Sequence, residues 1–210
     1  MTTLDSKQIQ ISSAIELFSK GEINQALDAV QGLLKDYPHE PVLFNIRGAC
    51  FADLGQLDVA VTNYKEAISI QPDYAKAHFN LAGSLHDLGQ LKAAVKSYKK
   101  TLEIEPNYAE AFNNLGNVFQ ELEQGDSAVQ SYKRALEIKP DYVAAQYSLG
   151  NTFMELGQLD EALKSYEAAL KLKPDFVEAI NNLGITFFKL HKLDEAMKSY
   201  EKALALDPDF

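Results

Sequence analysis

Apolar residues recur along this chain at helical spacing. Between residues 143 and 156, Leu149 and Phe153 fall on one face of a helix, and a second run from 159 to 172 repeats the pattern around Tyr166. Gly157 separates the two runs, and Pro174 follows the second. Because glycine readily ends a helix and proline cannot continue one, this segment predicts a helix, a short turn and a second helix.

The same pattern returns every 34 residues. Six prolines keep this spacing: Pro38, Pro72, Pro106, Pro140, Pro174 and Pro208. Five tyrosines keep it as well: Tyr64, Tyr98, Tyr132, Tyr166 and Tyr200. The period predicts an N-terminal extension (1–6) and one array of six units: 7–40, 41–74, 75–108, 109–142, 143–176 and 177–210. Because one hairpin cannot bury its own apolar face, neighbouring units are expected to stack, with the tyrosines as core residues.

Several further positions agree in phase with the prolines. In the second unit they are Phe44, Arg47, Gly48, Phe51, Gly55, Ala60, Tyr64, Ala67 and Pro72. This pattern resembles the tetratricopeptide repeat (TPR) family, over almost the whole chain. The resemblance implies an all-α fold, a right-handed α-solenoid of six helix-turn-helix units, with a concave groove lined by the first helices. Glu123 and His191 stand where other units have the turn glycine.

Composition narrows the classes of partner. The net charge is −10, and Arg47 and Arg134 are the only arginines, so the sequence lacks the basic surface that nucleic acid or an acidic membrane usually requires. Residues 1–6 do not form a signal peptide, and no apolar run approaches the roughly 20 residues that span a bilayer. We therefore expect a cytoplasmic chain with a protein or peptide ligand.

The residues that carry chemistry form no recognisable site. Cys50 has no second cysteine to pair with and is expected to be a small buried apolar residue. The four histidines include His78 and His86, which are eight residues apart on one predicted helix without a third metal ligand. The turn glycines open no phosphate loop. The sequence thus predicts no enzyme activity within these residues, no metal and no cofactor.

Asparagines gather at the predicted groove. Asn80, Asn114 and Asn182 share one phase, with Ser148 at the same place in the fifth unit. A row of side-chain amides can bind peptide backbone with little dependence on sequence, because each amide offers donors and an acceptor. The predicted groove residues are Asn45, Phe79, Asn80, His86, Asn113, Asn114, Asn117, Gln120, Tyr147, Ser148, Asn151, Met154, Asn181, Asn182 and Phe188. A purely structural role, in which the amides bond neighbouring backbone, stays open.

Three functions fit this pattern. The first is a non-catalytic scaffold that binds an extended peptide or a partner helix. The second is the substrate-selecting module of a larger enzyme, because the asparagine row is similar to that of O-linked N-acetylglucosamine transferase; a sulfotransferase is a related choice. The third is self-association through the last helix, where Tyr200, Ala203, Leu204 and Phe210 are expected to be exposed. A chain that continues beyond residue 210 would cover that face, and an added polar helix is expected to raise the melting temperature.

Overall fold

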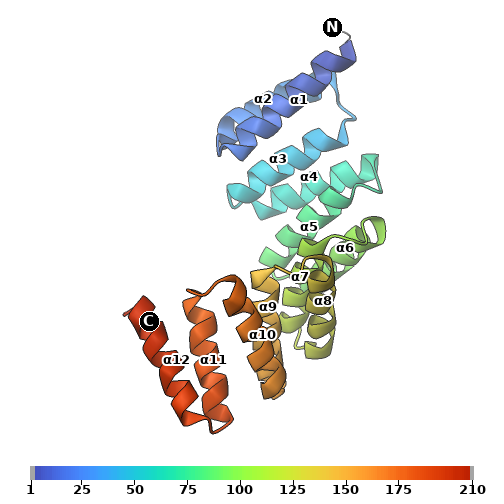
Figure 1. Ribbon diagram of the computed structural model, residues 1–210. Helices are drawn as coiled ribbons and strands as arrows, with labels where there is room; N and C mark the ends of the chain where they lie inside the picture. The colour runs from blue at the N-terminus through green and yellow to red at the C-terminus, as the bar shows by residue number, and fades with distance from the viewer. Residues whose placement is uncertain (1–2, 209–210) are drawn as a thin grey trace. The chain divides into compact units, whose positions relative to one another are not determined.

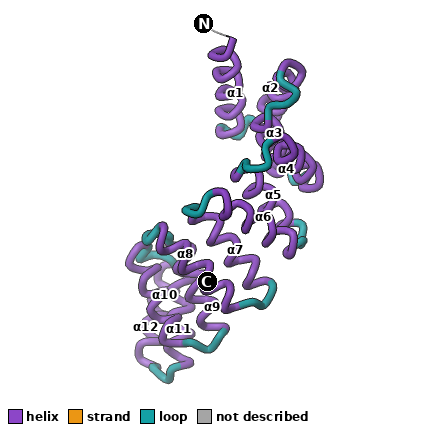
Figure 2. Tube along the Cα trace, turned by 90° about the vertical axis from the view of Figure 1, so that its right-hand side faces the viewer, coloured by secondary structure: helices purple, strands orange, loops and turns teal. Residues whose placement is uncertain are grey.

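The computed structural model describes residues 3–208, and every regular element in that range is an α-helix (Figures 1 and 2). The described helices are α1 (Thr3–Ser19), α2 (Ile23–Asp36), α3 (Pro41–Asp53), α4 (Leu57–Ile70), α5 (Ala75–Asp87), α6 (Leu91–Ile104), α7 (Ala109–Glu121), α8 (Gly125–Ile138), α9 (Val143–Glu155), α10 (Leu159–Leu172), α11 (Val177–Lys189) and α12 (Leu193–Leu206). The prediction of an all-α fold built from helical hairpins is confirmed.

Consecutive helices pack in pairs, such as α3 with α4 and α9 with α10. Within a compact unit, the second helix of one pair also contacts the first helix of the next, as α4 contacts α5 and α10 contacts α11. Each helix pair from α3 to α12 lies within one 34-residue segment. Helix α1 begins at Thr3, so residues 3–6, which the period leaves outside the first segment, belong to the first helix.

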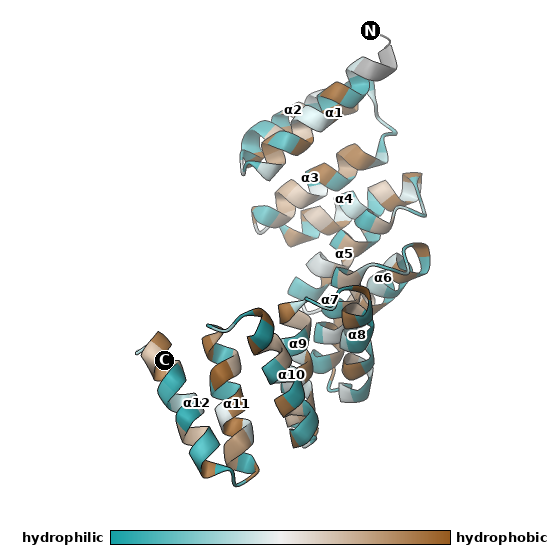
Figure 3. Cartoon of the chain, in the orientation of Figure 1, coloured by the Kyte–Doolittle hydropathy of each residue, from teal (hydrophilic) through white to brown (hydrophobic). Residues whose placement is uncertain are grey.

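The helices gather into two compact units, α1–α6 and α7–α12, divided after Pro106. Each unit contains three helix pairs. Apolar and polar stretches alternate along the helices of both units (Figure 3), as expected when one side of each helix is buried. The continuity of a single array over residues 7–210 stays a prediction.

Tyrosine rings form the centre of the helix pairs from α3 to α12, and Val30 stands at this place in the first pair. Tyr132 and Tyr166 are fully buried, and each ring lies on a glycine of the preceding helix. A Cβ atom added at Gly116 would stand 2.6 Å from Cε1 of Tyr132, so the glycine makes room for the ring. The third segment carries Ala82 in place of this glycine. The core role predicted for the tyrosines at 64, 98, 132 and 166 is confirmed.

The turns inside the helix pairs share one backbone conformation. Gly157 has a φ of 72°, in the left-handed region that suits glycine. Glu123 and His191 adopt the same region, with φ values of 58° and 59°. The repeat geometry therefore imposes this conformation even where the side chain disfavours it.

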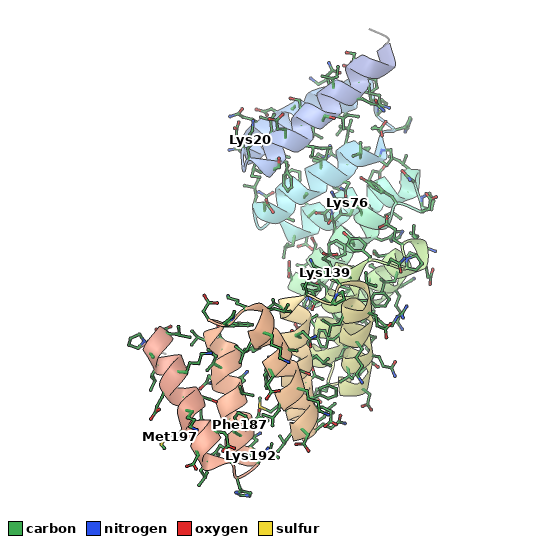
Figure 4. All side chains as sticks on the ribbon, viewed as in Figure 1. Lys20, Lys76, Lys139, Phe187, Lys192 and Met197 are labelled. Atoms are coloured by element: carbon green, nitrogen blue, oxygen red, sulfur yellow. The ribbon has the colours of Figure 1, made fainter. Side chains whose placement is uncertain are left out.

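Directly after His191, the Lys192 ammonium lies 5.9 Å from the centre of the Phe187 ring (Figure 4).

The outer face of α12 is apolar, although its residues differ from those expected. Leu193 and Met197 are 59% and 58% exposed, and Met197 projects from the side of α12 that faces away from α11 (Figure 4). Leu204 is exposed, as predicted. Ala203 is buried and Tyr200 partly buried, because both pack toward α11, so the predicted exposure of Ala203 is wrong. Phe210 lies outside the described residues.

Candidate functional site

All of the predicted groove residues lie on the first helices of the pairs, which are α3, α5, α7, α9 and α11. Those on α3 and α5 belong to the first compact unit, and those on α7, α9 and α11 to the second. The residues therefore form two sets, and each set has its own surroundings.

In the first unit, Asn45 and Asn80 meet at a hollow of about 280 Å³. Asn80 Nδ2 donates a hydrogen bond of 3.0 Å to Oδ1 of the buried Asn45. The floor is apolar and includes Phe18 and Ile46. Lys76, on α5, also lines this hollow (Figure 4). An apolar floor with a fixed amide pair suits the side chain and backbone of a peptide.

The other two predicted residues of this unit lie outside the hollow. The Phe79 ring packs edge-on against Tyr98, with the ring centres 5.8 Å apart, so Phe79 contributes to the core. His86 is partly buried and does not line the hollow. Sequence reasoning missed Phe18 and Ile46 because it searched for amides. The 34-residue period could have identified Ile46, because Ile46 occupies the position that Asn80 has in the next segment.

In the second unit, tyrosine hydroxyls hold the asparagines of α7 and α9. Tyr132 donates a hydrogen bond of 2.7 Å to Asn117 Oδ1, and Tyr166 donates one of the same length to Asn151 Oδ1. Burial raises the pKa of both tyrosines well above the usual value, so the hydroxyls stay protonated donors. Within residues 3–208, neither Asn117 Nδ2 nor Asn151 Nδ2 donates a hydrogen bond. Each amide is fixed by its oxygen and keeps its NH₂ group available.

The remaining polar residues of this unit link neighbouring helices. Asn182 Nδ2 lies 2.9 Å from Asn151 Oδ1 and 3.1 Å from the Tyr147 hydroxyl. Gln120 Nε2 donates a hydrogen bond of 3.0 Å to Glu155. The Met154 sulfur lies 3.8 Å from the Thr186 hydroxyl. The structure thus brings Tyr147, Asn151 and Asn182 together in one hydrogen-bonded group.

Asn113 differs from its counterpart Asn45. It is only 5% exposed, and its Nδ2 donates a hydrogen bond of 3.2 Å to Asn114 Oδ1. Its Oδ1 is buried without a hydrogen-bond partner in the described part of the chain. Asn45 Oδ1 accepts a hydrogen bond from Asn80, which stands 35 positions later. The residue 35 positions after Asn113 is Ser148, whose side chain is shorter. The serine that interrupts the asparagine row therefore leaves an unpaired oxygen.

The last predicted residues show no such links. Asn181 is partly buried, and Phe188 is exposed on α11. Within residues 3–208, no cluster of His, Cys, Asp and Glu could hold a metal ion, and no helix is long and apolar enough to cross a membrane. Burial raises the pKa of the Cys50 thiol to about 11, so it is poorly nucleophilic at neutral pH.

Family models match most of the chain. A model described as TPR repeat matches residues 48–86, 83–125, 121–157 and 150–191, and a model described as Tetratricopeptide repeat matches residues 177–210. The chain belongs to the tetratricopeptide repeat family. Its TPR helices agree with a solved structure of the MamA protein at a TM-score of 0.76 and 26% identity, covering 81% of this chain and 93% of MamA.

Two further proteins show how far the similarity reaches. PilF of Pseudomonas aeruginosa superposes with a TM-score of 0.87, covering 98% of this chain and 94% of PilF. At 14% identity, that likeness shows the fold alone. The peroxisomal targeting signal receptor of Saccharomyces cerevisiae is 25% identical over 84 residues, which are 40% of this chain. The matched stretch is only 14% of the receptor.

Proposed function

We propose that this chain, like other members of the tetratricopeptide repeat family, acts as a protein-interaction scaffold. We propose that its second unit binds an extended peptide segment of a partner protein along α7 and α9. Asn117 and Asn151 donate hydrogen bonds from Nδ2 to carbonyl oxygens of the peptide. The binding is therefore directed mainly at backbone and depends little on the sequence of the peptide.

The orientation of the two amides carries this proposal. The hydroxyls of Tyr132 and Tyr166, each 2.7 Å from an asparagine Oδ1, fix which end of each amide is available. A donor held in place before binding loses less entropy when the ligand arrives. Asn117 and Asn151 are one repeat apart, so the two donors recur in step with the stacked helices. A row of this kind suits an extended chain.

Two other observations support a peptide ligand. The hollow of about 280 Å³ in the first unit has the apolar floor and polar wall that receive a peptide side chain. One relative of this chain is named as a receptor for a targeting signal, although it matches over only part of its length.

The test replaces both asparagines by aspartate. Asn117→Asp/Asn151→Asp keeps an oxygen for each tyrosine hydroxyl and converts each NH₂ donor into an acceptor. Peptides selected from a displayed random library on the unmodified chain are expected to bind the double variant at least about tenfold more weakly, because two hydrogen bonds of about 1 kcal/mol each are lost. Affinity is measured by fluorescence anisotropy, and folding by circular dichroism.

Asn24→Asp/Asn107→Asp is the matched control, since both asparagines are exposed and the change of charge is identical. This control is expected to bind like the unmodified chain. Equal binding by a folded Asn117→Asp/Asn151→Asp variant would show that the two amides are only structural.

A second function is favoured by the face of α12. Met197 is 58% exposed, whereas Val129 and Leu163, at the same phase of α8 and α10, are 9% and 8% exposed because the next helix covers them. We propose that a second copy of the chain covers this face by pairing α12 with α12. Helix α1 is the less suitable partner, since Ser13 stands where the other first helices carry leucine or arginine.

The finer predictions from sequence remain open to their own tests. Whether the chain is the substrate-selecting module of a glycosyltransferase or sulfotransferase is tested by determining what the reading frame encodes after residue 210. The absence of enzyme activity and the cytoplasmic location also stay predictions.

A further inference from the structure

A second hollow, of about 510 Å³, lies on the opposite side of α5 from Lys76 and Asn80. Leu81 and Leu85 form part of its floor. At 3.6 residues per turn, these leucines lie about 100° to 180° around α5 from Lys76 and Asn80. The two hollows share no lining residue and are separate. Helices α4 and α6 form the walls, and Ile68 of α4 adds to the apolar floor.

Lysines surround this apolar floor. Lys65 comes from α4, and Lys96 and Lys100 come from α6. Lys100 pairs at 3.0 Å with Glu103, which also lines the hollow, but Lys65 and Lys96 have no acidic partner among residues 3–208. Helix α6 carries four lysines, twice as many as α10 or α12. This is a local positive surface on a chain whose net charge is −10.

We propose that this hollow binds an acidic segment of a partner protein. An apolar side chain of that segment packs on Leu81 and Leu85. Its carboxylates pair with Lys65, Lys96 and Lys100. Charge complementarity of this kind steers the encounter and fixes the register of the bound segment. The site is independent of the peptide site at Asn117 and Asn151, because it lies in the other compact unit and on different helices.

A protein fits this surface better than another polyanion. The floor is aliphatic, and the lining provides no Phe, Tyr or Trp ring on which a nucleic-acid base could stack. The imidazole of His78, which also lines the hollow, lies with Nε2 3.0 Å from the Pro72 carbonyl oxygen. The negative net charge opposes the approach of a long polyanion or an acidic membrane, whereas a short acidic segment meets only the local lysines.

The repeats themselves indicate substitutions that the fold accepts. Other segments carry glutamate at the same phase as three residues of this hollow. Glu167 and Glu201 share the phase of Lys65, Glu161 and Glu195 share that of Ala93, and Glu66 shares that of Lys100. All of these glutamates are exposed on second helices. Lys65→Glu/Ala93→Glu/Lys100→Glu therefore reverses the charge of the hollow with residue types that this architecture already carries.

The experiment selects peptides from a displayed random library on the full chain and counter-selects with this triple variant. The peptides that discriminate are expected to combine acidic residues with an apolar residue. Their affinity is expected to fall at least about tenfold in the triple variant, because opposed charges replace favourable ones at two positions. Binding should also weaken as added salt shortens the screening length from about 10 Å at 0.1 M to about 3 Å at 1 M.

The matched control is Gln130→Glu/Lys164→Glu/Lys198→Glu, which changes the net charge equally at exposed positions of α8, α10 and α12. It should bind the selected peptides like the unmodified chain, as should Asn117→Asp/Asn151→Asp. The proposal is overturned if no peptide discriminates, or if the discriminating peptides are neutral or basic. It is also overturned if the binding of a DNA duplex or of phosphatidylserine vesicles depends on Lys65 and Lys100 and that of no acidic peptide does.

Discussion

The asparagines of this chain show how one residue type takes several roles on the first helices of the repeats. Asn45 and Asn80 bond each other across neighbouring helix pairs. Asn117 and Asn151 accept from tyrosine hydroxyls and keep their NH₂ groups available. Asn113 is buried with an unpaired oxygen. The difference lies in the residue that stands 15 or 35 positions away, which decides what each amide can reach.

Ser148→Asn is expected to stabilise the second unit by about 1 kcal/mol, since a buried acceptor gains a donor. The expected hydrogen bond corresponds to the one that Asn80 Nδ2 donates to Asn45 Oδ1 at the same phase, two segments earlier. The measurement is the free energy of unfolding from urea titration followed by circular dichroism.

Ser148→Asp is the matched control, because aspartate has the same shape as asparagine but presents an acceptor to Asn113 Oδ1. It should give no gain in the free energy of unfolding. A stabilisation of similar size from Ser148→Asp would show that the effect does not come from pairing Asn113.

At the scale of the element, the contact between glycine and tyrosine determines how closely two helices of a pair approach. Glycines 48, 116, 150 and 184 each face the ring of the tyrosine that lies 16 residues later. The period could predict both residue types as core positions. It could not show that the ring, rather than a backbone atom, occupies the space that the glycine leaves.

Gly116→Ala is expected to lower the free energy of unfolding by roughly 1–3 kcal/mol, because the new methyl group would overlap the buried Tyr132 ring. The control is Gly83→Ala, where the nearest atom, the Tyr98 hydroxyl, is 3.8 Å from the added Cβ. Urea titration compares the two variants. A loss for Gly83→Ala as large as that for Gly116→Ala would contradict the assignment to the ring.

At the scale of the whole molecule, each second helix contacts the next first helix within a unit, and α12 has no such partner within the described residues. Leu193 and Met197 therefore remain exposed, although they follow the same apolar pattern as their covered counterparts. Unpartnered apolar surface of this kind favours association.

The chain is expected to form dimers as its concentration rises, and Leu193→Gln/Met197→Lys is expected to keep it monomeric. Light scattering over a concentration series measures this change. Val59→Lys/Leu172→Lys, which alters two exposed apolar residues elsewhere, should leave the association unchanged. Dimers that persist in Leu193→Gln/Met197→Lys would exclude α12 as the contact.

The sequence alone determined the helical hairpins, their turns and their tyrosine core. These features depend on short-range patterns that repeat with one period, so each copy strengthens the prediction for the others. Glu123 and His191 take the same turn conformation as the glycines, which the residue types by themselves did not predict.

Only the tertiary structure decided what the groove residues do. Hydrogen bonds between residues 15 to 35 positions apart fix the amides, and their formation depends on side-chain reach, as the short Ser148 shows. The hollows of about 280 and 510 Å³ in the first unit likewise arise from residues of four and three helices, respectively, which no single helical pattern brings together. Periodicity specifies which face of a helix is buried, whereas the partner of each polar atom depends on atoms that belong to other helices.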